Sequence, residues 1–145
     1  MTTAAKTNFG AVLKLADSGG TPAAIAELTS VGVPGISVNL LDATSHDSTG
    51  GAREFIAEDV YDTGEIAIEG HYIAGSTEDD LFIAAATGAV KQDFELLVKA
   101  SSGTETISGS CFVQNYEPGE LTIEGKQMFS ATLKVTGQLT QAATV

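Results

Sequence analysis

The stretch that decides the fold class runs from residue 64 to residue 73 and reads GEIAIEGHYI. Its apolar and polar side chains alternate with a period of two residues. One face would carry Ile66, Ile68 and Tyr72, and the other face would carry Glu65, Ala67, Glu69 and His71. Successive side chains of a strand point to opposite faces, and strands with one buried face are typical of antiparallel sheets. The stretch therefore predicts an antiparallel strand that is buried on one side.

Stretches of similar character occur on both sides of this one. They cover residues 11–17, 92–100, 105–117, 119–125 and 127–139, together with two segments on either side of a Pro-Gly break at 34 and 35. Glycine-rich or Pro-Gly turns separate most of them, which is typical of consecutive antiparallel strands rather than of strands that alternate with helices. We expect one mainly β domain over residues 1–145, an antiparallel β-sandwich or partly rolled barrel with one flanking helix.

The helix is expected over residues 76–88, which read STEDDLFIAAATG. Ser76 or Thr77 can cap it, the acidic residues that follow suit the positive end of the helix dipole, and Gly88 ends it. The two ends of the chain, residues 1–10 and 138–145, are small and polar, and we expect them to form an N-terminal and a C-terminal arm.

The connection over residues 42–63 is unusually long and acidic. Together with the start of the next strand, residues 42–65 hold seven of the 19 acidic residues and one of the seven basic ones. Loops of this length are usually functional or disordered. A solvated loop without a role is one interpretation. The other is a segment that becomes ordered on a partner, with Phe55 and Ile56 as buried anchors and Arg53 and Glu54 as charged contacts.

Charge and composition exclude several classes of protein. The formal net charge is −12 and the basic residues are scattered singly, so tight binding to nucleic acid through phosphate contacts is not expected. No apolar run approaches the ~20 residues needed to cross a membrane, and no secretion signal is recognisable. The single cysteine, Cys111, cannot form an intramolecular disulfide, which favours a reducing cytoplasm as the place of synthesis.

Residues that could carry chemistry are few. The histidines His46 and His71 are candidate bases near neutral pH, but His46 lies in the polar run SHDS and His71 on the polar face of a strand. The acidic run at 78–80 lacks the alternating ligands of a calcium loop and is better explained by helix capping. Cys111 has no basic neighbour and is expected to pack in the core. We therefore predict no catalytic residue, no metal site and no cofactor.

The order of several short motifs resembles one family. The motifs are DATS at 42–45, DS at 47–48, GG and REFI within 50–56, D-x-GE at 62–65 and SATLKVTG at 130–137. In this order and spacing, and over most of the chain, the sequence resembles the major tail-tube proteins of long-tailed, non-contractile bacteriophages and of related gene-transfer particles.

The resemblance implies a structural protein of the virion tail, made in the cytoplasm of the bacterial host. Its copies would join edge to edge into hexameric rings, and the rings would stack into a tube through which DNA passes without sequence-specific binding. Partners would be further copies, a tape-measure protein, and tail-tip and terminator proteins. The 42–63 segment would be an inter-ring stacking loop, whose contact residues would be Asp47, Arg53, Glu54, Phe55, Ile56 and Asp62. The candidates for lining the channel are Glu65, Glu69, Glu95 and Glu124.

Two alternatives remain open from the sequence. A secreted tube protein of a contractile injection system would show similar rings and a similar fold. A ligand-binding β-sandwich would instead require a pocket with converging polar groups.

Overall fold

The computed structural model describes residues 9–17, 20–100 and 103–143. The N-terminal arm that we expected over 1–10 lies almost entirely outside the described residues. In the described part of the chain, the elements in order are β1 (Val12–Asp17), β2 (Ala23–Ala24), β3 (Leu28–Val31), β4 (Ser37–Asp42), the 3-10 turn η1 (Thr49–Gly51), β5 (Phe55–Asp62), β6 (Glu65–His71), α1 (Thr77–Thr87), β7 (Gln92–Lys99), β8 (Thr104–Pro118) and β9 (Met128–Ala143). The mainly β class with one helix is confirmed.

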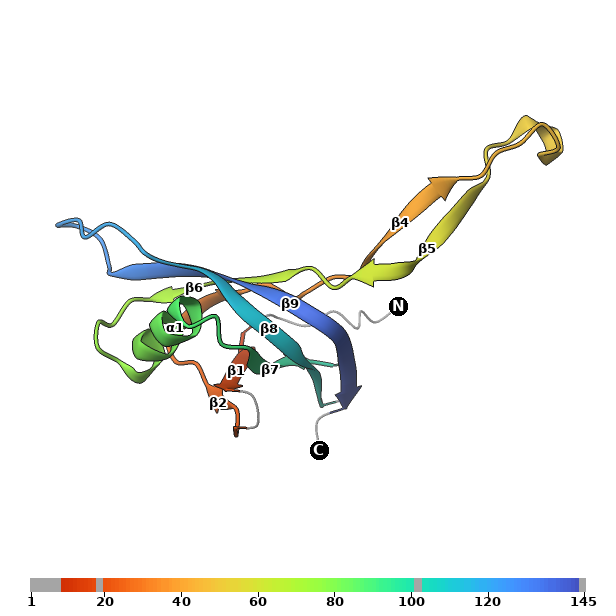
Figure 1. Ribbon diagram of the computed structural model, residues 1–145. Coiled ribbons are helices and arrows are strands. Elements are labelled where there is room, and N and C mark those ends of the chain that lie inside the picture. Colours follow the sequence, from red (N-terminus) through yellow and green to blue (C-terminus); the bar gives the residue numbers. More distant parts are fainter. Residues whose placement is uncertain (1–8, 18–19, 101–102, 144–145) are drawn as a thin grey trace, which may run out of the picture.

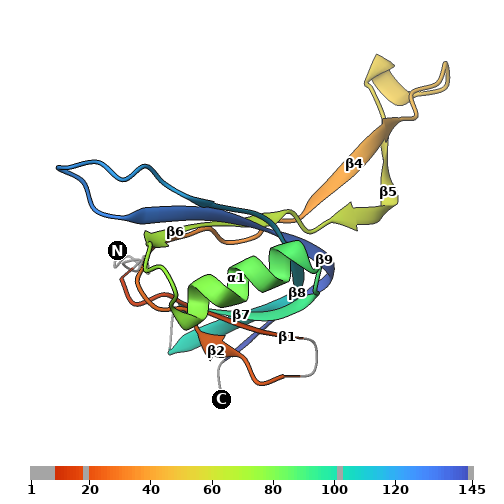
Figure 2. The same cartoon turned by 60° about the vertical axis from the view of Figure 1, so that its left-hand side comes forward.

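Seven of the strands form one antiparallel sheet in the order β2-β1-β7-β8-β9-β6-β3, and β4 and β5 form a separate hairpin. The large sheet is strongly curled, and α1 lies within the curl (Figures 1 and 2). Of the two arrangements that the sequence left open, the partly rolled barrel is therefore the correct one.

The alternation within β6 is confirmed, since Ile66 and Ile68 are buried and Glu65 and Glu69 are exposed. The strands β1, β7, β8 and β9 alternate in the same way over much of their length. The core consists of Leu13, Leu15, Ile25, Ile66, Ile68, Phe82, Ala85, Phe94, Leu96, Ile107, Cys111, Val113, Phe129, Ala131, Leu133 and Val135. Removing each large side chain from water contributes about 1.5–3 kcal/mol, so this apolar face provides most of the driving force for folding. Burial also raises the pKa of Cys111 to about 12, as expected for a core thiol.

The two edges of the sheet approach each other at residues 25–27, which carry the chain from β2 at one edge to β3 at the other. The amide of Ile25 donates to the carbonyl of Leu13 at 2.9 Å, and the amide of His71 donates to the carbonyl of Glu27, also at 2.9 Å. Glu27 has a φ of 64°, a strained value for a residue with a side chain. Through these two hydrogen bonds, residues 25–27 connect β1 near one edge of the curled sheet to the end of β6 near the other.

Gly70 is required where this link crosses β6. A Cβ atom at Gly70 would lie 2.7 Å from the carbonyl oxygen of Glu27, and the backbone cannot move away without breaking the bond to His71. We expect Gly70→Ala to lower the free energy of unfolding by about 1–3 kcal/mol, measured by urea denaturation. Gly35→Ala is the matched control, because a Cβ atom there meets nothing within 4 Å. Equal stabilities of the two variants would contradict the tight crossing.

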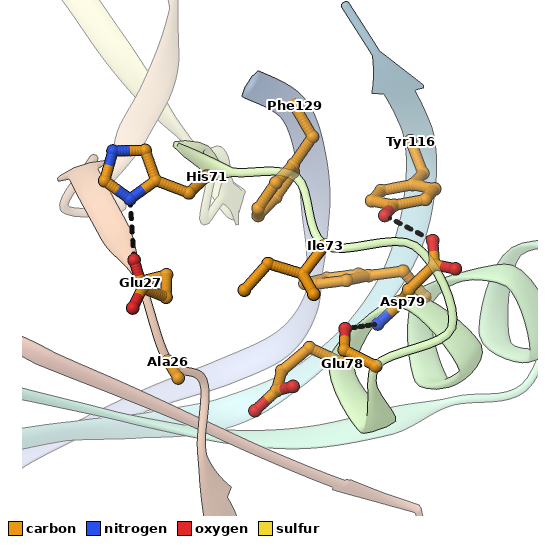
Figure 3. A pocket seen from close by; sticks show the side chains of 10 residues that line it. Ala26, Glu27, His71, Ile73, Glu78, Asp79, Tyr116 and Phe129 are labelled. Atoms are coloured by element: carbon orange, nitrogen blue, oxygen red, sulfur yellow. Dashed lines mark hydrogen bonds and ion pairs between the residues drawn. The ribbon is translucent and has the colours of Figure 1, made fainter. Parts of the chain in front are cut away.

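The helix predicted over 76–88 is confirmed, with Ser76 as its N-cap and Gly88 as its C-cap. The hydroxyl oxygen of Ser76 accepts a hydrogen bond from the amide of Asp79 at 3.2 Å, and Asp79 accepts one from the amide of Gly75 at 3.0 Å. The carboxylate of Asp79 also accepts a 2.7 Å bond from the hydroxyl of Tyr116 on β8 (Figure 3). Burial, and then this bond, raise the pKa of Tyr116. The first turn of α1 is thereby tied to the sheet.

Three expected boundaries are wrong. Residues 119–125, predicted to be a strand, form part of the turn between β8 and β9, because the two strands pair only as far as Pro118 and Phe129. The C-terminal arm predicted over 138–145 is replaced by strand as far as Ala143, paired with β8. The 42–63 segment is irregular only between Asp42 and Phe55, and its second half is β5.

Candidate assembly surfaces

The hairpin β4–β5 projects away from the curled sheet and pairs only with itself (Figures 1 and 2). Every residue of both strands is exposed. Its large apolar side chains, together with those leading into it, are Val33, Ile36, Val38, Leu40, Leu41, Phe55, Ile56, Val60 and Tyr61. A lone two-stranded hairpin is only marginally stable in water, and contiguous exposed apolar side chains mark interaction sites. The hairpin therefore has the composition of a surface that is buried in an assembly.

Both faces of the hairpin are apolar. Leu40 lies directly opposite Ala57, and Val38 lies directly opposite Tyr61. Because residues two apart on a strand share a face, Leu40, Ala57 and Phe55 form one apolar stripe, whereas the register shifts between Leu40 and Val38. Leu41 pairs with Ile56 on the other face. A partner could therefore cover either side of the hairpin.

Polar contacts order the free end of the hairpin. Arg53 donates to the carboxylate of Asp42 at 3.0 Å, and the amide of Thr44 donates to the same carboxylate at 2.9 Å. Hydrogen bonds from Thr44, and then the one from Arg53, lower the pKa of Asp42. The amide of Glu54 donates to the Thr44 hydroxyl at 2.8 Å. The guanidinium of Arg53 is still largely exposed, so it can contact a partner while paired.

The six residues predicted for inter-ring contact do not form one cluster. Asp47, Arg53 and Glu54 lie in the connection at the free end of the hairpin, and Phe55 and Ile56 begin β5. Asp62 ends β5 at the opposite end of the hairpin, where Lys134 on β9 donates to its carboxylate at 3.1 Å. A hydrogen bond from the amide of Gly64, and then Lys134, lower the pKa of Asp62. Asp62 is thus an anchoring residue of the hairpin in this protein.

The surface of the sheet opposite the core is here called the polar face. Of the four candidates for the channel lining, Glu65, Glu69 and Glu95 lie on strands of this face. Glu124 does not: it lies in the turn between β8 and β9, and its placement on a strand was wrong. Hydroxyl side chains fill the middle of the polar face on β8 and β9: Thr106, Ser108, Ser110, Ser130, Thr132 and Thr136.

The polar face also carries two lysines that were not among the candidates for the channel lining. Lys134 lies directly opposite Glu65, and Lys14 lies directly opposite Glu95. The sequence did contain a signal for these positions. Each lysine stands between two buried apolar residues, in LKL at 13–15 and LKV at 133–135, which places it on the side of the strand that faces away from the core. The exposure of Leu121 and Ile123 was also not predicted. The alternation in LTIE indicates a strand, but no neighbouring strand pairs with this segment in the described structure.

The histidines do not form a catalytic site. His46 lies in the hairpin connection, and Nδ1 of His71 lies 2.6 Å from Oε2 of Glu27 beside a cavity under α1 (Figure 3). The cavity has a volume of about 20 Å³, which is room for roughly one water molecule. Among the described residues, no group of histidine, cysteine and acidic side chains could hold a metal ion. No helix in the same part of the chain is long and apolar enough to cross a membrane.

Solved structures share this fold over nearly the whole chain. The tail of an empty gene transfer agent particle, refined with C6 symmetry, has a TM-score of 0.79 and 18% identity, over 96% of this chain and 100% of that one. A baseplate structure of the anti-feeding prophage gives 0.76 and 10%, over 99% and 98%. The SPP1 tail tube gives 0.65 and 12%, over 93% and 76%. No curated protein sequence matches.

The chain thus has the fold of chains in tubular tails, a curled sheet with a projecting apolar hairpin. The sequence profile of the phage tail tube protein family matches residues 11–141, and the chain belongs to this family. It is therefore a tail tube component of a virion particle, and it is not an enzyme.

Proposed function

We propose that six copies of the chain close into a ring and that the rings stack through the β4–β5 hairpin into a tube that conducts DNA. The observation that carries the proposal is the hairpin, whose apolar side chains are exposed on both faces. The sixfold symmetry printed for the gene transfer agent tail supports a ring of six.

The C-terminal part of β9 supports contact within the ring. Residues 140–143 pair with β8 on one side, whereas β6 reaches only as far as Lys134 on the other. Among the described residues, the last hydrogen bond on that side runs from the hydroxyl of Thr63 to the carbonyl of Gly137, at 3.3 Å. An uncovered strand edge attracts uncontrolled pairing. We infer that a neighbouring copy in the ring covers this edge, which also removes that hazard.

The polar face is the surface proposed to line the channel. Its acidic side chains Glu65, Glu69 and Glu95 would repel the DNA phosphates at distances comparable to the ~8 Å screening length of physiological salt. Both Lys134 and Lys14 lie opposite an acidic residue, so neither offers phosphate an isolated positive charge. The hydroxyl groups between them provide a neutral surface. DNA would then pass without binding.

The proposed partners are further copies of this chain, a tape-measure protein, and tail-tip or terminator proteins at the ends of the tube. A tube protein of a contractile injection system is the second candidate, because a baseplate chain of the anti-feeding prophage matches the fold with a TM-score of 0.76. Neighbouring genes separate the two, since only a contractile system encodes a sheath alongside its tube.

Electron microscopy of the purified chain, alone and with tail-initiating partners, tests the proposal. We expect stacked rings or tubes with a central bore. A chain that stays monomeric under all of these conditions, at concentrations up to the millimolar range, would overturn the proposal. The test uses the full chain, since the hairpin and β9 both take part.

A further inference from the structure

We propose that Lys134, assisted by Thr63, is a positioning residue that fixes the direction in which the β4–β5 hairpin leaves the sheet. Through the hairpin it would set the rotation and spacing between a ring and the next copy of the ring. The second part rests on the proposed function, whereas the first concerns the isolated chain.

Among the described residues, the hairpin is held in its direction by its attachment to the sheet. β4 and β5 pair only with each other, and the hairpin extends clear of the sheet in both views (Figures 1 and 2). Its two attachment segments, residues 32–36 before β4 and 62–64 after β5, are here called the root. Any freedom at the root would therefore be passed on to the whole hairpin.

The β5 side of the root is bound to β9 by three contacts. Nζ of Lys134 lies 3.1 Å from Oδ1 and 3.4 Å from Oδ2 of Asp62, so the ammonium group is held by both oxygens. The hydroxyl of Thr63, a residue that is 4% exposed, donates to the carbonyl of Gly137. The carbonyl of Gly64 accepts a bond from the amide of Val135 at 3.2 Å. Successive residues are thus fixed to one strand.

The β4 side of the root is packed against β6 and against the β5 side of the root. The amide of Gly32 donates to the carbonyl of Ala67 at 2.7 Å, and a Cβ atom at Gly32 would lie 3.2 Å from that oxygen. A Cβ atom at Gly64 would lie 3.2 Å from the carbonyl oxygen of Gly35, and Gly64 has a φ of 71°. The two sides of the root therefore cross at backbone contact, where only glycine fits easily.

Lys134, which holds the root from β9, acts on the direction of the hairpin rather than on folding. Its side chain and that of Asp62 are both about half exposed, and exposed ion pairs contribute little to stability. The eight residues of β5 span roughly 26 Å at about 3.3 Å per residue. A rotation of about 10° at the root would move the far end by about 4–5 Å, more than the length of a hydrogen bond. A small rotation at the root after loss of the Lys134 contact would therefore become a large displacement where the hairpin meets the next ring.

The experiment measures hairpin direction in the free chain. Spin labels are placed on cysteines introduced at Thr49, near the free end of the hairpin, and at Thr140 on β9, while the buried Cys111 stays unlabelled. We expect Lys134→Met to widen the distribution of label distances at least twofold with an unchanged unfolding midpoint. Lys14→Met, the other lysine of the polar face, is the matched control and should leave the distribution narrow. An unchanged width in Lys134→Met would overturn the proposal.

Two further variants keep the test decisive. Asp62→Asn retains the Oδ1 acceptor for the amide of Gly64 and removes the charge, and Thr63→Val removes the hydroxyl with little change of shape. Both should widen the distribution, and both failing to do so would count against the root as described. Cryo-electron microscopy of Lys134→Met tubes should show an altered or variable twist between rings. If the unmodified chain forms no tubes, the proposed function fails, but the label distances still decide the role of Lys134.

Discussion

Replacing Leu40 and Phe55 by serine should abolish tube elongation and leave a folded monomer. Both side chains lie on one apolar stripe of the hairpin and are more than half exposed in the single chain. Burying each on the adjoining ring would contribute about 1.5–3 kcal/mol, and every ring would make the contact six times. The loss for a whole ring contact far exceeds what a stack can tolerate. Electron microscopy and sedimentation of the purified variant measure the outcome.

The controls separate assembly from folding. Circular dichroism and the unfolding midpoint of the variant should match those of the parent chain, because neither side chain contacts the core. Deleting residues 47–58 should give the same folded, non-elongating chain. Ile123→Ser, which removes a fully exposed aliphatic side chain outside the hairpin, is the matched control for lost hydrophobicity. Tubes of normal length from the Leu40 and Phe55 variant would contradict a stacking role for the hairpin.

The strands and the helix of the sheet could be predicted because one-sided burial leaves a clear signal. As a strand with one buried face, GEIAIEGHYI can be oriented in one way only if Ile66 and Ile68 are to be buried and Glu65 and Glu69 exposed. Ser76 and Gly88 bracket the helix by local hydrogen bonding, which depends on few distant contacts. In these segments, local preference and tertiary packing agree.

The hairpin could not be predicted in detail, because both of its faces are exposed in the single chain. Period-two burial cannot reveal a strand such as β5, where Phe55 and Ile56 are equally open to solvent. The turn at 119–125 failed for the opposite reason: its alternation is good, but no strand lies beside it. The end of β9 was missed because residues 138–145 are small and polar, although pairing with β8 continues as far as Ala143.

The sequence singled out the segment that forms the hairpin, and its role in contact between rings stays a prediction. The acidic motif around Arg53 and Phe55 identified the hairpin. The anchoring of Asp62 by Lys134 joins residues 72 positions apart, and no local pattern contains such a distance. The prediction of rings and a tube came from the family resemblance, because the composition of a single chain does not indicate how its copies assemble. The polar and apolar faces of the sheet are the link between the two levels.

Changing Glu65 and Glu69 together to lysine should leave tube formation intact and greatly reduce DNA delivery. Both residues lie on the exposed side of β6, where Glu65 faces Lys134 and Glu69 faces Ser130. The double change raises the charge of each chain by four, and in a ring of six it would line the bore with paired lysines. Lysines clustered along a polyanion bind it through its phosphates and release its counterions. DNA would therefore be retained on a surface that we propose repels it in the parent chain.

We expect DNA ejection, followed by dye fluorescence, to slow by about tenfold or more at physiological salt, and to recover as the salt concentration rises, because the attraction is screened. The matched control is Glu120→Lys combined with Glu124→Lys, which changes charge equally in the turn between β8 and β9 and away from the strands of the polar face. Equal slowing in the control would mean that net charge alone governs delivery. Normal ejection by the Glu65 and Glu69 variant would place the channel on another surface. A defect confined to β6 would identify the polar face as the wall along which DNA moves, since only there does each added lysine meet the passing phosphates.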